Sequence, residues 1–237
     1  MRSAVNDPEA IKAANPAVEC GRVPLERVLS DIATQPEHEV RRYTLNQFVS
    51  GTSESWLPAA LFAKAKGKGI TEIRGSVLAV DISKNWEHGT IAAANQNGEI
   101  VETELVRGYV APTEQRLLND LMEMFTKHSC RAIALDDRQL PSLAKRLKAN
   151  GVPVWQLWTK EISAACSATY ALFANGQISH ANDPTLVAQM PNGITKYTGE
   201  TWLISRKESI GDIDALMATV MAVYVASRSN TPSVQVF

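Results

Sequence analysis

The sequence predicts an α/β protein: a mixed β-sheet flanked by helices and preceded by a helical N-terminal connector. Two patterns carry this prediction. Three apolar, strand-like runs follow one another between residues 76 and 106, and a strand–helix–strand rhythm follows them up to residue 157. Strands joined by a tight turn pair antiparallel, whereas strands joined through a helix pair parallel by a right-handed crossover. The sheet is therefore expected to contain both kinds of pairing.

Residues 1–70 are expected to form the helical connector or linker arm. Pro8 suits the first position of a helix, and Asn15-Pro16 ends that helix. A second helix is expected from about residue 24 to 33, because four apolar residues share one helical face: Leu25, Val28, Leu29 and Ile32. Residues 37–48 are expected to form a third helix.

Residues 71–237 are expected to form the α/β domain, which begins with strands over residues 76–83, 90–94 and 100–106. Asn97-Gly98 between the second and third runs is a strong hairpin signal. A helix is expected over residues 113–128, where apolar side chains recur at helical spacing: Leu117, Leu118, Leu121, Met124 and Phe125.

The rest of the domain alternates between helices and short strands. A strand over residues 131–135, a helix that ends at Gly151 and a strand over residues 152–157 form the parallel unit. Further along, the sequence predicts a helix, an edge strand and a final helix, over residues 160–174, 200–205 and 212–227.

The composition is that of an ordinary globular protein, with 45% hydrophobic and 21% charged residues. A net charge of -1 excludes a histone-like DNA binder but not a DNA enzyme, because an acidic metal site offsets a basic groove. Three widely spaced cysteines predict neither a zinc site nor a disulfide framework and favour a reducing cytoplasm: Cys20, Cys130 and Cys166. The sequence has no run of 18 apolar residues and no signal pattern, so neither a membrane span nor export is expected.

Carboxylates border apolar segments at three distant places. Asp81 ends the first strand, Asp136 and Asp137 follow a later strand, and Asp212 and Asp214 begin the final helix. A buried carboxylate is costly unless it is paired or bound to metal, and Mg²⁺ and Mn²⁺ prefer oxygen ligands. If three of these groups converge, two ions about 4 Å apart would suit phosphodiester hydrolysis. Taken singly, each aspartate also suits a turn or a helix cap, and Asp212 is the more natural cap.

Several motifs occur in a fixed order along the chain. Residues 178–186 read ISHANDPTL, Asn192 and Lys207 follow, and residues 213–218 read IDALMA. These segments are similar to the H-x-x-(D/N)-P-x-L segment and the I-D-x-x-x-A signature of the large terminase subunits of tailed bacteriophages. Matches of the same kind lie at residues 14–16, 24–25, 41–48, 77–81, 131–136 and 151–154. Together they resemble that family over nearly the whole chain.

The resemblance implies an RNase H-like nuclease domain that cuts double-stranded concatemeric viral DNA during genome packaging. It implies a two-metal site, filled by Mg²⁺ or Mn²⁺, with Asp81, Asp136 and Asp214 as catalytic ligands. Asp137 is a fallback for the second ligand, and Asp212 is a weaker, assisting candidate. Two further residues of the family segment receive smaller roles: Asp183 as an assisting group and His180 as a loop or packing histidine.

Lysines and arginines near these acids are the candidate DNA contacts, because such side chains hold backbone phosphates. The preferred residues are Lys84 and Lys207, followed by Arg138 and Lys196. Lys160 and Arg206 also lie near the last acid in the sequence.

The family also implies partners and a location: a motor ATPase domain, a small terminase subunit, a portal and the host cytoplasm. Residues 67–71 only superficially resemble the phosphate loop of a motor, so ATPase activity is not predicted for this chain. The motor is then expected either in a longer parent protein or in a separate one. The alternatives are another RNase H-like nuclease, of the junction resolvase or transposase type, and a catalytically inert packaging subunit.

Overall fold

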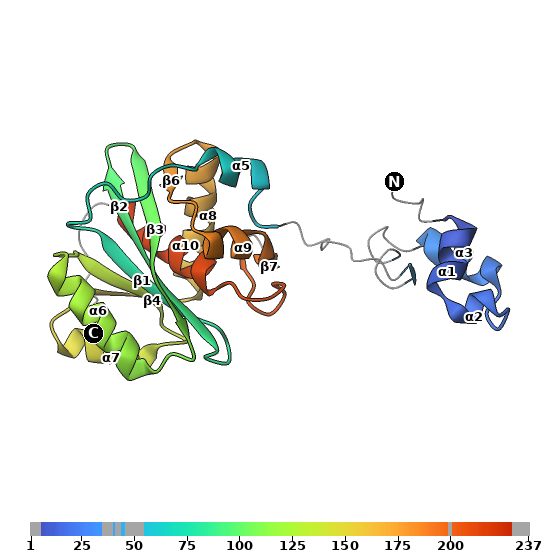
Figure 1. The fold of residues 1–237 in the computed structure, drawn as a ribbon, viewed down its shortest axis with the longest axis horizontal. Helices are drawn as coiled ribbons and strands as arrows, with labels where there is room; N and C mark the ends of the chain where they lie inside the picture. Colours follow the sequence, from blue (N-terminus) through green and yellow to red (C-terminus); the bar gives the residue numbers. More distant parts are fainter. Residues whose placement is uncertain (1–5, 35–39, 41–43, 46–54, 199–200, 229–237) are drawn as a thin grey trace. The chain divides into compact units, whose positions relative to one another are not determined.

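The computed structural model of the protein describes residues 6–34, 40, 44–45, 55–198 and 201–228 (Figure 1). The chain divides into two compact units, residues 1–54 and 55–237. The helix expected over residues 37–48 falls almost entirely outside the described residues.

The described part of the first unit contains the helices α1 (Pro8–Ala14), α2 (Pro16–Glu19) and α3 (Leu25–Thr34). Asp7 caps α1, because its carboxylate accepts a hydrogen bond from the backbone N–H of Glu9 at 3.1 Å. The helices enclose a small apolar core of Ile11, Val18, Ile32, Val40 and Leu45. The amphipathic pattern of the sequence thus gives this unit a core of its own.

The second unit is built on a six-stranded sheet in the order β5-β4-β1-β2-β3-β6 (Figure 1). The β1–β2 and β2–β3 pairs are antiparallel, and the other three pairs are parallel. The mixed sheet expected from the sequence is therefore confirmed, and the three-residue strand β6 is an addition to it. The strands are β1 (Val77–Ile82), β2 (His88–Asn97), β3 (Ile100–Val110), β4 (Ala132–Asp136), β5 (Val154–Leu157) and β6 (Ile178–His180).

Helices cover both faces of this sheet (Figure 1). On one face lie α6 (Glu114–Lys127) and α7 (Pro141–Ala149). On the other lie α8 (Thr159–Ala174) and α10 (Asp214–Ala226), with the short helices α5 (Ala59–Lys64) and α9 (Pro184–Gln189) beside them. Every residue of α10 is buried. None of the helices in the described part of the chain is both long enough and apolar enough to cross a membrane.

The two faces of the sheet carry different side chains, because successive residues of a strand point to opposite faces. Large apolar residues face α6 and α7: Leu78, Val80, Ile82, Ile91, Ile133 and Leu135. Small residues dominate the face toward α10, among them Ala79, Ala92, Ala94 and Ala134. The alanines allow α10 to pack closely against the sheet, which fixes the position of its N-terminus.

Residues 55–70 belong to the second unit, so the division lies before residue 55 and not near residue 70. Trp56, Leu57 and Phe62 are buried in the same core as α8 and α10. The backbone also joins β6, since the His180 N–H donates to the Ala65 carbonyl at 3.0 Å. Apolar burial and backbone pairing together tie this segment to the sheet.

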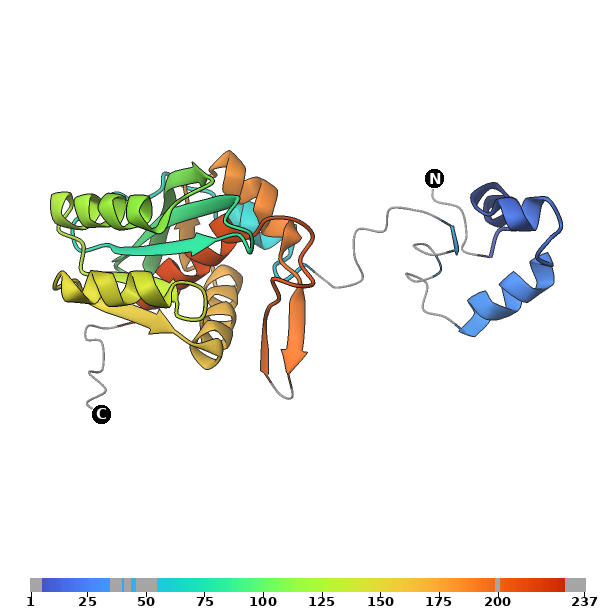
Figure 2. The same ribbon diagram turned by 90° about the horizontal axis from the view of Figure 1, so that it is seen from below.

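A small hairpin follows α9 and the short 3-10 helix Met190–Asn192. Its strands, β7 (Thr195–Thr198) and β8 (Thr201–Ile204), form a separate two-stranded sheet that projects from the body of the unit (Figure 2). The strand expected over residues 200–205 therefore forms, but it does not extend the edge of the main sheet. It is held on α8, where the Ser163 hydroxyl donates to the Trp202 carbonyl at 2.5 Å.

Candidate active site

Three of the predicted aspartates meet at one end of the sheet, on the face covered by α10. Asp81 pairs with Thr90 across β1 and β2, and the parallel register Val80↔Leu135 brings Asp136 beside Asp81. Asp214 begins α10 at the same end and accepts a hydrogen bond from the Thr90 hydroxyl at 2.5 Å. The exposed fractions of Asp81, Asp136 and Asp214 are 0%, 0% and 2%. The fold thus assembles three buried carboxylates from three distant segments.

Arg206 lies among these carboxylates. It follows β8, and its two terminal nitrogens donate to the two oxygens of Asp81 at 2.6 Å each. Its Nη2 also lies 3.7 Å from Oδ2 of Asp136. A guanidinium fork matches a carboxylate in this bidentate manner. The positive charge of Arg206 therefore offsets part of the negative charge of the aspartates.

Asp136 has a second arginine as its partner. The Nε and Nη2 atoms of Arg138 lie 3.2 Å and 3.1 Å from the two carboxylate oxygens, and the backbone N–H of Arg138 donates at 3.1 Å. The side chain of Arg138 is 47% exposed, whereas that of Arg206 is 21% exposed. The more solvated Arg138 pair should contribute less to stability, because water screens exposed charges.

Asp214 is held by neutral donors. The amide of Gln189 donates to its Oδ1 at 2.9 Å, and the Gln189 oxygen accepts from the backbone N–H of Ala215 at 2.7 Å. Gln189 therefore caps the N-terminus of α10 by accepting from a free backbone N–H group. The sequence favoured Asp212 for this role. That expectation is wrong: Ile213 is the N-cap residue, and Asp212 pairs with His88 at 3.5 Å on the surface.

The electrostatics of the site reflect burial of like charges. Burial, together with the charges of Asp136 and Asp214, raises the pKa of Asp81 to about 7 despite its ion pair with Arg206. For Arg206 burial acts in the opposite direction, but the pair with Asp81 and the charges of the two other aspartates outweigh burial and raise its pKa. The site as a whole therefore favours additional positive charge.

The chemistry of these ligands fits a divalent cation, although the side chains are turned to other partners. Among the described residues, no three Asp, Glu, His or Cys side chains form a group that could hold a metal ion. Three carboxylates nevertheless outnumber the two arginines that contact them. Their oxygens are the ligand type that Mg²⁺ and Mn²⁺ prefer. The residues therefore fit a metal site. In this structure the positive charge beside the carboxylates comes from Arg206.

The remaining acidic candidates have structural contacts of their own. Asp137 accepts a hydrogen bond from the amide of Gln156 on β5. Asp183 caps α9 by accepting from the backbone N–H groups of Thr185 and Leu186 at 2.8 Å and 3.4 Å. These contacts explain both residues without a metal.

His180 is a packing residue. Its buried ring stacks on Phe62 with centroids 4.0 Å apart and planes 8° apart. Nδ1 accepts from the backbone N–H of Asn182 at 3.1 Å, so Nε2 is the atom that donates to the Phe62 carbonyl at 2.9 Å. Both ring nitrogens are therefore used within the fold, and burial lowers the pKa of the imidazole.

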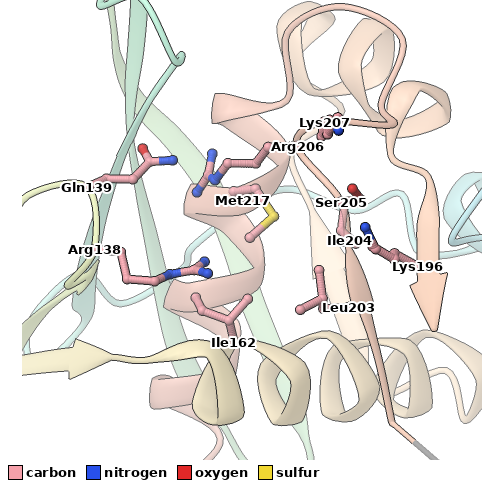
Figure 3. A pocket seen from close by; sticks show the side chains of 10 residues that line it. All are labelled: Arg138, Gln139, Ile162, Lys196, Leu203, Ile204, Ser205, Arg206, Lys207 and Met217. Carbon is pink, nitrogen blue, oxygen red and sulfur yellow. The ribbon is translucent and has the colours of Figure 1, made fainter. Parts of the chain in front are cut away.

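Arg206 lines two cavities, and Asp214 also lines the smaller of them. The larger, of about 440 Å³, has Ile162 and Met217 among its apolar walls, and Arg138 and Arg206 extend into it from opposite sides (Figure 3). Lys196 and Lys207 line it as well. The smaller, of about 130 Å³, is lined by Lys84, Asp212 and Asp214, among others. All four predicted DNA contacts therefore surround Arg206, with one of them, Lys196, paired to Glu208 at 3.1 Å.

The sequence did not reveal two contributors to the site, Thr90 and Gln189, or the role of a third, Arg206. Thr90 lies opposite Asp81 across the β1–β2 turn, so counting outward from that turn could have found it. Gln189 carries no local signal, because its role depends on the approach of α9 to the start of α10. Arg206 stood out only as a basic residue near the last acid, whereas its partner Asp81 lies 125 residues away in the sequence.

The fold matches solved structures of bacteriophage large terminases and their nucleases. The large terminase of bacteriophage HK97 matches 94% of this chain with a TM-score of 0.62 and 16% identity, and the match covers 55% of that protein. The large terminase nuclease of thermophilic phage G20c matches 73% of this chain with a TM-score of 0.56 and 15% identity, over 98% of its own length. A structure of the same nuclease with bound magnesium matches with a TM-score of 0.57, 15% identity and coverage of 74% and 98%.

Comparisons of sequence alone find less. No family model matches the chain, and no curated protein matches it. The likeness is therefore one of three-dimensional structure, at identities of 16% and 15% in the matches above. This chain has the RNase H-like fold of the nuclease domain of phage large terminases.

Proposed function

We propose that this protein is a metal-dependent endonuclease that cuts concatemeric viral double-stranded DNA during genome packaging. The observation that carries the proposal is the convergence of Asp81, Asp136 and Asp214, all buried, at one end of a sheet with the terminase nuclease fold. Buried carboxylates of like charge require a compensating cation. The magnesium-bound G20c nuclease, which has the same fold, supports Mg²⁺ or a similar ion as that cation.

The three aspartates would hold two Mg²⁺ or Mn²⁺ ions. When bound, such ions supply an activated water and stabilise the leaving 3′ oxygen of the phosphodiester. Thr90 and Gln189 hold the Asp214 carboxylate in a fixed orientation through its two oxygens. An oriented ligand binds metal more tightly than a free one, so these two residues act as positioning groups.

The cations around the carboxylates would hold the DNA backbone. Lys207, Arg138 and Lys196 line the larger cavity, and Lys84 lines the smaller one. Contacts of this kind position a duplex without reading its sequence. We therefore expect cleavage with little sequence preference in the isolated protein.

The packaging context would be supplied by partners. The chain spans 55% of the length of the HK97 large terminase. We propose that it works beside a motor ATPase domain, with a small terminase subunit and a portal, in the host cytoplasm. The HK97 match covers 94% of this chain, which is more than residues 55–237 alone contain, so it reaches into residues 1–54. This supports a role for the first unit as the connector on the motor side.

A plasmid assay tests the proposed activity. Supercoiled DNA is incubated with the protein and Mg²⁺ or Mn²⁺, with EDTA as one control and Asp81→Asn as another. We expect nicking and linearisation that disappear in both controls. Asp137→Asn is the matched variant, because Asp137 neighbours the site but bonds to Gln156, and it should cut like the wild type.

The other results distinguish the alternatives. Cutting that prefers branched DNA over linear duplex would indicate a junction resolvase instead. No cutting with either metal ion would contradict the proposed activity and favour an inert packaging subunit. Cutting that persists in Asp136→Asn, tested as a further variant, but is lost in Asp137→Asn would move the second ligand from Asp136 to the fallback Asp137.

A further inference from the structure

Arg206 is the most deeply buried cation of the site and has the shortest ion pair in it. Its guanidinium lies 2.6 Å from both oxygens of Asp81, and Asp136 is 3.7 Å away. Gln139 completes its shell: with its amide oxygen toward Arg206, Gln139 accepts from Nε at 2.7 Å and donates to the Ile82 carbonyl at 3.1 Å. The guanidinium thus spans two of the three carboxylates that a metal ion would need.

The same contacts make Arg206 a competitor of the metal ion. Both oxygens of Asp81 accept hydrogen bonds from Arg206. A divalent ion at this carboxylate therefore has to compete with the positive charge of the guanidinium. The total charge leads to the same conclusion, because a guanidinium and a divalent ion both compensate the carboxylates. When a ligand must displace an internal partner, only the molecules whose site is free can bind it. The apparent affinity therefore falls in proportion to the fraction of molecules with a free site.

We infer that Arg206 is a built-in cation of the metal-free site: the divalent ion displaces it from Asp81, and the freed guanidinium turns into the larger cavity to bind a DNA phosphate. This inference rests on the proposed function. It assigns Arg206 two successive partners, a carboxylate before metal binding and a phosphate after it.

The cavities give the side chain room for this movement. Arg206 lines both the 440 Å³ and the 130 Å³ cavity, so free space adjoins this residue in two places. In the larger one it faces Arg138 and shares the walls with Lys196 and Lys207 (Figure 3). Guanidinium groups bind phosphate and carboxylate with the same bidentate geometry, which makes the change of partner chemically simple.

Metal affinity tests the first half of the inference. Mn²⁺ is titrated by calorimetry into the wild type, Arg206→Gln, Arg138→Gln and Lys207→Gln. We expect Arg206→Gln to bind Mn²⁺ about tenfold more tightly, Arg138→Gln a few-fold more tightly and Lys207→Gln about as the wild type does. An equal increase of Mn²⁺ affinity in all three variants would mean that only the loss of a nearby positive charge matters. Weaker binding by Arg206→Gln would mean that Arg206 orients Asp81 for the metal, and either result overturns the inference.

DNA affinity tests the second half. A short duplex is titrated in EDTA and then in Ca²⁺, a divalent ion used here as a probe of binding. In EDTA, Arg206→Gln should bind DNA as the wild type does, because the wild-type guanidinium is then bound to Asp81. In Ca²⁺, Arg206→Gln should bind DNA several-fold more weakly than the wild type. Lys207→Gln should bind DNA more weakly in both conditions. A loss by Arg206→Gln that is the same in EDTA and in Ca²⁺ would contradict the exchange.

A measurement on the wild type covers the case in which Arg206→Gln does not fold. The Nε–H resonance of Arg206, assigned by its loss in Arg206→Lys, should shift when Mg²⁺ is added. A resonance that stays in place while Mg²⁺ binds would overturn the inference and leave the proposed function intact. Failure of the wild type to bind any divalent ion would overturn both.

Discussion

The two faces of the central sheet use alternate residues of the same strands for different purposes. Toward α6 and α7, β1 and β4 present only apolar side chains, such as Val80 and Leu135. Toward α10, the next residues along each strand are Asp81 and Asp136. Side chains one position apart thus differ in both chemistry and surroundings. The same strands thus supply the hydrophobic core on one face and the candidate site on the other.

The separation also depends on what covers each face. α6 and α7 fill their side with leucines, which accommodate the large residues of the sheet. α10 packs on alanines, and its closeness to the sheet is what brings Asp214 within 2.5 Å of Thr90. The α10 face is therefore less tolerant of added volume near the site.

Asp136→Asn should have the largest effect on activity. Loss of an outer partner of a metal ligand already costs about 10–100-fold in metal affinity or activity, so loss of the ligand should cost more than about a hundredfold in cleavage. Circular dichroism should show that the fold is retained, because asparagine has nearly the same shape. Cleavage of a plasmid within tenfold of the wild-type rate would remove Asp136 from the site.

Leu135→Ala is the counterpart on the opposite face. Leu135 is completely buried between the sheet and its helices, so the cavity should lower the free energy of unfolding by about 2–5 kcal/mol. Urea denaturation measures this loss. The cleavage rate per folded molecule should be unchanged, and a large fall in that rate would show that the two faces are not independent.

Asp81 should make the free energy of unfolding depend on pH, unlike the apolar residues on the opposite face of the sheet. The pKa of Asp81 is raised from 3.8 to about 7 in the folded protein, so folding favours the protonated form. In EDTA, the stability of the wild type relative to Asp81→Asn should therefore fall as the pH rises from about 4 through 7, by a few kcal/mol at about 1.4 kcal/mol per pKa unit. Urea denaturation of both proteins at pH 5 and pH 8 measures this difference. A difference that rises with pH would contradict the environment described for Asp81.

A pair of alanines in β2 compares the two faces under added volume. Ala92 faces α10 and Ala93 faces α6 and α7, and both are fully buried. Ala92→Val and Ala93→Val should each destabilise the protein by about 1–3 kcal/mol. Only Ala92→Val should also slow cleavage, because it displaces α10 and with it Asp214. Equal cleavage by both variants would show that the position of α10 does not control the site.

Residue patterns predicted the sheet well where the signal is local. β1, β2 and β4 contain short apolar runs, α6 follows helical spacing, and α10 is a continuous apolar segment rich in alanine and methionine, so each element could be recognised from its own residues. The positions of Asp81, Asp136 and Asp214 at segment ends were visible for the same reason. β6 and α9 lie in a polar stretch and are stabilised mainly by contacts with the rest of the fold, which a local pattern does not contain.

The hydrogen-bond and ion-pair partners of the aspartates could not be predicted from local sequence patterns. Arg206 meets Asp81 only because the hairpin returns the chain to the sheet end, and Gln189 replaces Asp212 at the start of α10 only because α9 packs there. The boundary between the two units lies before residue 55, because Trp56 and Phe62 join the core of the second unit and pack against Phe173, more than 100 positions later. Such contacts depend on the assembled fold.

The most direct test of the central claim is the binding of Mn²⁺ to the protein, followed by electron paramagnetic resonance of the free ion. The wild type should take up Mn²⁺, and Asp81→Asn, Asp136→Asn and Asp214→Asn should each bind it far more weakly. Leu135→Ala, measured under conditions where it is folded, should bind as the wild type does. Uptake that is unchanged in all three aspartate variants, or no uptake by the wild type, would contradict the claim that these carboxylates form one metal site.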